Sequence, residues 1–152
     1  MSISEQSKQY NQIYNQYNKL YHDIATAFGF SDTQYWLLYT LYIDDAPVTQ
    51  NDLAMMLSTP KQTVHSAVAK LAEGGFLVLT QQKGPRNSKA VALTEAGLQL
   101  CERCVKPLLE AEERAMQKIS AEERAAFLAI YEKRFHYFDV EIQSILKGAE
   151  QL

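Results

Sequence analysis

The spacing of the apolar residues changes abruptly near the middle of the chain, and this change limits the folds that the sequence can adopt. Polar caps at Thr49 and Thr59, with Pro60 expected as the first helical residue after Thr59, predict two short helices over residues 49–57 and 59–73. The pattern then becomes strand-like over 76–80 and 89–93, with a turn at 81–88 that contains glycine and proline. Two short helices on a tight turn, followed by a β-hairpin, are typical of a helix-turn-helix with a wing.

Further helices are predicted on both sides of this motif. Pro107 lies inside one of them, so a kink or break is expected near Val105. Capping boxes at Ser31 and Ser120 mark the starts of two others. The predicted outer helices span residues 5–28, 31–43, 94–118 and 120–147. The expected fold is mainly α with a small β-hairpin wing, in the order α-α-α-α-β-β-α-α.

The charge is unevenly distributed along the chain. The 152 residues carry a formal net charge of −3. Residues 47–94 hold five cations and two acids, a net +3, so the remainder carries −3 − 3 = −6. A basic segment within an acidic chain fits a protein that presents one face to phosphates.

The second helix of the pair divides into two faces. Val64, Val68 and Leu71 form one apolar stripe that is expected to face inward. The opposite face carries cations, hydrogen-bonding groups and small residues, with no acid before Glu73. An ordinary solvated helix face is the alternative, but the neighbouring helix and hairpin favour DNA contact.

The side-chain chemistry of the residues on that face predicts which part of a DNA duplex each would contact. Gln62 and His65 are expected to reach base edges in a major groove, and Lys61 and Lys70 to neutralise phosphates. The amides at the helix start near Thr59 also offer a phosphate site. The turn at 81–89 carries three cations and no acid, which suits contact along a minor groove, whereas a soluble hairpin tip is the alternative. The candidate DNA contacts are Thr59, Lys61, Gln62, Thr63, His65, Ser66, Lys70, Lys83, Arg86, Asn87 and Lys89.

Residues 48–97, VTQNDLAMMLSTPKQTVHSAVAKLAEGGFLVLTQQKGPRNSKAVALTEAG, resemble the winged helix-turn-helix of MarR-family regulators. The resemblance rests on the DLA of the first helix, the T-x-x-V…V-x-x-L-x-x-x-G of the second and the LTEAG after the hairpin. One departure is Gly84, because the family often has an acid two residues before the wing arginine, here Arg86.

The resemblance implies a DNA-binding transcriptional regulator, usually a repressor, that binds a pseudo-palindromic operator as an obligate homodimer. Residues 31–94 would form the DNA-binding lobe, and 1–30 with 95–152 the helical dimerisation region. Apolar side chains in that region would be too exposed on a monomer: Ile3, Tyr10, Phe127, Ile130, Phe135, Phe138, Ile142 and Ile145.

The resemblance also implies a pocket for a small aromatic or phenolic ligand between the dimer helices and the lobe. Aromatic residues of the first two predicted helices could line it, although aromatic side chains at helical spacing more often pack in a core or interface. These candidates are Tyr14, Tyr17, Tyr21, Tyr35, Trp36 and Tyr39.

Other functions find little support in the sequence. Catalytic and phosphate-loop motifs are missing, so an enzyme is not expected. Cys101 and Cys104 are expected to be buried thiols, and neither a metal site nor a cofactor is predicted. No apolar run could cross a membrane and no export signal is recognised, so cytoplasmic residence is expected. An adaptor with this fold that has lost DNA binding remains the alternative function.

Overall fold

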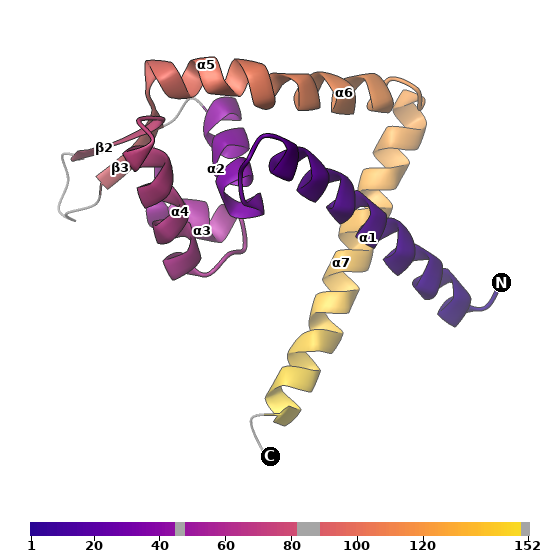
Figure 1. Ribbon diagram of the computed structural model, residues 1–152. Coiled ribbons are helices and arrows are strands. Elements are labelled where there is room, and N and C mark those ends of the chain that lie inside the picture. The colour runs from indigo at the N-terminus through magenta and orange to yellow at the C-terminus, as the bar shows by residue number, and fades with distance from the viewer. Residues whose placement is uncertain (45–47, 82–88, 150–152) are drawn as a thin grey trace. The chain divides into compact units, whose positions relative to one another are not determined.

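The computed structural model describes residues 1–44, 48–81 and 89–149 and shows two compact units, residues 1–108 and 109–152 (Figure 1). Within the described residues, no helix is both long enough and apolar enough to span a membrane. The predicted DNA-binding lobe at 31–94 and the predicted dimerisation region are functional divisions, and they differ from these two compact units. That division stays a prediction.

Three helices of the first unit begin at polar capping residues, of which the sequence predicts two, Ser31 and Thr49. They are α1 (Ile3–Ala27), α2 (Asp32–Ile43) and α3 (Gln50–Met56). The side chains of Ser31 and Thr49 accept hydrogen bonds from amides in the first turns of α2 and α3, and the third residue of each helix bonds back. Each box satisfies amide groups that a helix start leaves without an intrahelical partner.

The core of this unit is built around α2. Four α2 side chains are buried and pack near α4 (Lys61–Glu73) and α5 (Glu95–Cys104). Tyr35 is one of them, and its hydroxyl donates a hydrogen bond of 2.7 Å to the carbonyl oxygen of Cys104. This bond joins α2 to the end of α5 inside the core and satisfies both polar groups.

The wing belongs to a three-stranded antiparallel sheet with the order β1-β3-β2. The hairpin strands β2 (Leu77–Gln81) and β3 (Lys89–Leu93) lie within one residue of their predicted ranges. The sequence missed β1 (Val48–Thr49), which pairs with β3 in the register Val48↔Val91. This short strand fixes the start of α3 to the base of the wing.

The long helix predicted after the wing is interrupted where Pro107 requires it. α5 ends at Cys104, Val105 stands between the helices, and α6 spans Lys106–Met116. Proline has no amide hydrogen to donate to the preceding turn, and its ring crowds that turn. The predicted break near Val105 is therefore confirmed.

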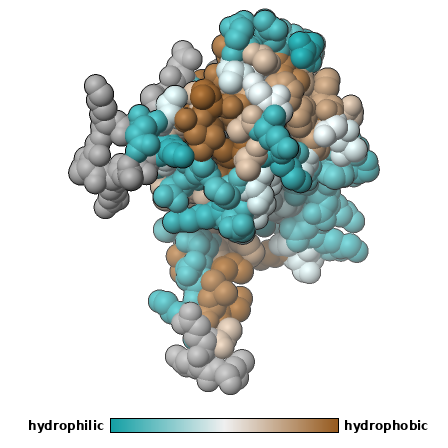
Figure 2. Space-filling model, turned by 60° about the vertical axis from the view of Figure 1, so that its left-hand side comes forward, coloured by the Kyte–Doolittle hydropathy of each residue, from teal (hydrophilic) through white to brown (hydrophobic). Residues whose placement is uncertain are grey.

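The second unit contains the rest of α6 and the 29-residue helix α7 (Ala121–Ala149). Ser120 and Glu123 form the predicted capping box before α7. None of the described α7 residues is buried. Ile130 and Phe135 are each 67% exposed, and hydrophobic surface is visible on the last turns of α7 in Figure 2.

Candidate nucleic-acid interface

The second helix of the helix-turn-helix, α4, is anchored by one apolar stripe. Val64, Val68 and Leu71 are at most 2% exposed, and Ala67 is also buried. α4 packs against α2, α3 and β2. The predicted inward orientation of the valines is confirmed, so the opposite side of α4 must face away from the core.

That opposite side is exposed and free of acids before Glu73. Its exposed residues are Lys61, Gln62, Thr63, His65, Ser66, Ala69 and Lys70. Within the described part of the chain, neither Lys61 nor Lys70 has a carboxylate within ion-pair distance. Both ammonium groups are therefore available to anionic groups outside the chain.

Two polar residues of this face already take part in hydrogen bonds. Nδ1 of His65 lies 2.9 Å from Oε1 of Gln50, which links α4 to the first residue of α3. The Ser66 hydroxyl donates to the carbonyl oxygen of Gln62 at 2.9 Å. His65 can thus meet a nucleic acid through the other edge of its ring, and Ser66 mainly as an acceptor.

The turn before α4 differs from the prediction that Thr59 caps the helix and Pro60 is its first residue. Pro60 is the N-cap, with an extended ψ of 136°, and no side chain caps α4. The Thr59 hydroxyl instead donates to the carbonyl oxygen of Leu57 at 2.9 Å. The first-turn amides of α4 consequently have no side-chain acceptor. The Thr63 amide donates to the carbonyl oxygen of Pro60 at 3.0 Å, so the amides of Lys61 and Gln62 are the ones left to bind an anion.

Ser58 gives this turn its direction. Its φ of 46° lies in the left-handed region that few residues other than glycine adopt. The amides of Ser58 and Thr59 bond back to the carbonyl oxygens of Met55 and Ala54, at 3.1 and 3.0 Å. α3 is thereby ended abruptly, and the chain turns directly into α4.

An acidic residue in α3 is engaged locally. The Asp52 carboxylate accepts hydrogen bonds from the amide and hydroxyl of Thr49, at 3.0 and 2.6 Å. These bonds lower the pKa of Asp52, so its charge is stabilised at the start of α3.

The wing contributes one described cation. Lys89 is exposed at the start of β3 and pairs in register with Gln81 of β2. The predicted contacts Lys83, Arg86 and Asn87 lie outside the described residues.

The six aromatic residues predicted for a ligand pocket do not share one environment. Tyr35 is buried in the core, whereas Tyr14 and Tyr17 are exposed on α1. The Trp36 ring lies 4.8 Å from the ring of Tyr21 and 5.1 Å from that of Tyr39.

Trp36 and Tyr39 line a depression of about 430 Å³ between α2 and the end of α3. Sequence reasoning missed its other lining residues, because α2 and the turn meet there only after folding. They are Asp32, Thr33, Thr40, Met56, Leu57 and Thr59.

Both cysteines are buried, free thiols, as expected. Burial raises the pKa of Cys101 to about 12 and also raises the pKa of Cys104. Protonated thiols are poor nucleophiles, so these residues act as small core side chains.

Comparison with known proteins finds one family that part of the chain resembles. Residues 28–86 match the model of the MarR family. No curated protein sequence matches the chain.

Solved structures share the fold over most of their length. NMB1585, a MarR family regulator from Neisseria meningitidis, is 19% identical, with a TM-score of 0.75 over 95% of this chain and 99% of that one. MepR from Staphylococcus aureus, in complex with DNA, is 22% identical, with a TM-score of 0.69 over 87% and 96%. A MarR transcriptional regulator from Methanosarcina mazei Go1 is 24% identical, with a TM-score of 0.64 over 88% and 96%. Residues 28–86 thus match the MarR family model, and the chain has a winged-helix fold similar to that of these solved MarR-family proteins.

Proposed function

We propose that this protein is a transcriptional regulator that binds duplex DNA through the outward face of α4. The observation that carries the proposal is the exposed, acid-free side of α4 opposite its buried valines. An α-helix fits the major groove of B-DNA, where donor and acceptor patterns identify each base pair. The complex of MepR with DNA, in a protein of the same fold, supports this reading.

The residues of α4 divide into two roles. Lys61 and Lys70 neutralise phosphates, which adds affinity without sequence preference. Gln62 and His65 contact base edges and provide selectivity. The uncapped amides at the start of α4, next to Thr59, receive a backbone phosphate.

The exposed residues Thr63 and Ser66 complete the contact surface of α4. The wing follows the backbone beside the minor groove, with Lys89 at its base and Lys83, Arg86 and Asn87 toward its tip.

A homodimer is part of the proposal, because the chain exposes more apolar surface than a monomer usually does. Ile3 on α1 and Phe127, Phe138 and Ile145 on α7 are each more than half exposed. Dimerisation through the terminal helices at 1–30 and 95–152 would bury them. The lobe at 31–94 would then be present twice, which fits a pseudo-palindromic operator with half-sites about 34 Å apart.

Repression is the proposed mode, since a dimer seated on an operator blocks access to it. A small aromatic ligand would release the DNA if it binds more tightly to a conformation in which the two recognition helices no longer match the half-sites.

Selection of bound fragments from random duplex DNA tests the proposal. A regulator is expected to enrich a sequence with two-fold symmetry and to lose affinity steeply as salt rises. Enrichment of no duplex would favour an adaptor that has kept the fold without DNA binding.

Variants of the selected complex assign the roles. Lys61→Ala is expected to weaken all duplexes alike and to reduce the salt slope by about two, one phosphate contact per protomer. Gln62→Ala is expected to relax base preference instead. Lys118→Ala, at an exposed lysine between α6 and α7, is the charge-matched control and should leave the salt slope unchanged.

A further inference from the structure

The depression between α2 and the end of α3 has the size of a small-molecule site. Its volume is about 430 Å³, within the range of ligand pockets. One wall comes from α2, with Asp32, Trp36 and Tyr39, and the other from Met56, Leu57 and Thr59. Both walls lie in the first compact unit, so one chain supplies the whole depression.

The α2 wall carries two aromatic rings, those of Trp36 and Tyr39. They meet edge to face, with centroids 5.1 Å apart and planes inclined by 72°. The face of an aromatic ring carries partial negative charge and attracts cations, tryptophan most strongly. The thioether of Met56 adds a polarizable, adaptable contact on the opposite wall.

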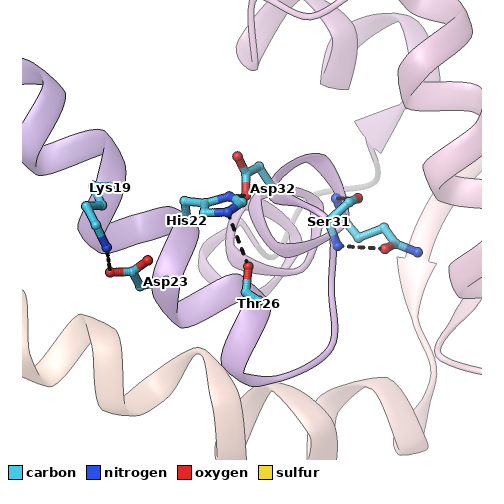
Figure 3. Close-up of polar contacts among 7 residues, drawn as sticks. Lys19, His22, Asp23, Thr26, Ser31 and Asp32 are labelled. Atoms are coloured by element: carbon cyan, nitrogen blue, oxygen red, sulfur yellow. Dashed lines mark hydrogen bonds and ion pairs between the residues drawn. The ribbon is translucent and has the colours of Figure 1, made fainter.

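Asp32 gives the depression a negative charge. Its Oδ1 lies 2.8 Å from Nδ1 of His22, whose Nε2 lies 3.5 Å from the hydroxyl of Thr26 (Figure 3). A carboxylate has two oxygens, so the contact with His22 engages only one of them. The described lining residues include no lysine or arginine.

We propose that this depression binds small aromatic cations, such as aryl-substituted ammonium compounds, in preference to aryl carboxylates or uncharged phenols. The aromatic faces attract the cationic group, and Asp32 is its counter-ion. An aryl carboxylate would meet the same carboxylate with like charge and without a compensating cation on the lining.

The inference that such a ligand also regulates the protein rests on the proposed function. Leu57 and Thr59 line the depression and belong to the turn that directs the chain into α4. A ligand that shifts this turn would re-aim the recognition helix.

Trp36 is the only tryptophan of the chain, so the tryptophan fluorescence comes from a residue that lines this depression. The free, full-length protein is titrated near pH 7.5 with benzyltrimethylammonium, benzoate and phenol. We expect saturable binding of benzyltrimethylammonium, about tenfold tighter than that of benzoate or phenol. Equal or tighter binding of benzoate or phenol, or no saturable response to the cation, would overturn the proposal.

Charge variants test the counter-ion. Asp32→Asn is expected to weaken benzyltrimethylammonium binding about three- to fivefold, and Asp32→Glu to restore it. Asp23→Asn is the matched control, because Asp23 is similarly exposed (53% against 57%) but pairs with Lys19 outside the lining (Figure 3). Equal losses in Asp32→Asn and Asp23→Asn would refute a specific role for Asp32.

The titration needs no DNA, which separates the two proposals. Cation binding in a protein that selects no duplex would support the site and reject the regulator. Duplex binding without cation binding would do the reverse. If both are present, benzyltrimethylammonium should weaken duplex binding in the wild-type protein, and it should do so less in Asp32→Asn.

Discussion

Gly97 lies in the first turn of α5, where the helix start touches the beginning of the wing. A Cβ atom on Gly97 would stand 2.1 Å from the carbonyl oxygen of Phe76 and 3.1 Å from Cδ2 of Leu93. Ordinary contact begins at 3.4 Å, so Gly97→Ala must separate the two backbones by about 1.3 Å. Both sides of this contact are held by backbone structure, and neither can swing away as a side chain would.

The cost follows from the bonds that hold this contact. The amide of Thr94 donates to the same Phe76 oxygen at 3.0 Å, and the Thr94 hydroxyl donates to the carbonyl oxygen of Gly75 at 2.6 Å. Losing both bonds costs about 2 kcal/mol, and residual overpacking adds about 1–3 kcal/mol. The higher helix propensity of alanine returns about 1 kcal/mol. Gly97→Ala should therefore lower the free energy of unfolding by about 2–4 kcal/mol.

Urea and thermal unfolding followed by circular dichroism measure this difference. Protein concentration is held fixed, because the stability of a dimer depends on it. For a chain of this length the expected fall in Tm is about 5–15 °C. Gly148→Ala is the control, because its added Cβ meets nothing within 4 Å, and it should leave Tm unchanged or raise it. If Gly97→Ala were as stable as Gly148→Ala, the close contact between the start of α5 and Phe76 would be refuted.

Three further predictions test the core and the turn. Tyr35→Phe leaves the buried carbonyl of Cys104 without its donor and should lower the free energy of unfolding in urea by about 1–3 kcal/mol. Tyr137→Phe, at an exposed position, should lower it by less than about 0.5 kcal/mol, and equal effects would contradict the buried bond. The thiols of Cys101 and Cys104, whose pKa values burial raises, should resist maleimide at pH 8 in the native protein and react after unfolding; rapid native labelling would contradict their burial. Ser58→Gly should be more stable than Ser58→Val by about 1–2 kcal/mol in thermal unfolding, because φ is 46° there, and a reversed order would contradict the left-handed turn.

Local chemistry made much of this fold predictable from the sequence. The capping boxes at Ser31, Thr49 and Ser120 each mark a helix start, since a side chain three residues from its partner amide needs no tertiary context. Pro107 predicted the break between α5 and α6 for the same reason. The inward stripe of α4 followed from helical spacing alone.

The features that were missed depend on contacts between distant segments. β1 has two residues, and only its pairing with β3 makes it a strand. The order Ser58-Thr59-Pro60 fits a cap at Thr59, but the left-handed Ser58 turns the chain so that Pro60 becomes the N-cap. Such a backbone choice has little signature in the side chains.

The same distinction between local sequence and contacts of distant segments applies to the candidate site. Spacing on α4 was enough to predict its exposed contact face, because one face of that helix is clearly apolar. α2 is apolar on nearly all sides, so periodicity could not separate the buried Tyr35 from Trp36 and Tyr39 at the depression. The lining by Met56 and Leu57 depends on how the α3–α4 turn packs near α2, which only the folded structure supplies.

Site-directed crosslinking tests most directly whether the outward face of α4 lies against DNA. The native thiols are buried, so Gln62→Cys introduces one accessible thiol, which can form a mixed disulfide with a thiol tethered to a base of the selected duplex. The account predicts efficient crosslinking at bases within each half-site and none from Lys118→Cys, between α6 and α7. A Gln62→Cys protein that binds the duplex with normal affinity but does not crosslink, or crosslinks no better than Lys118→Cys, would contradict it.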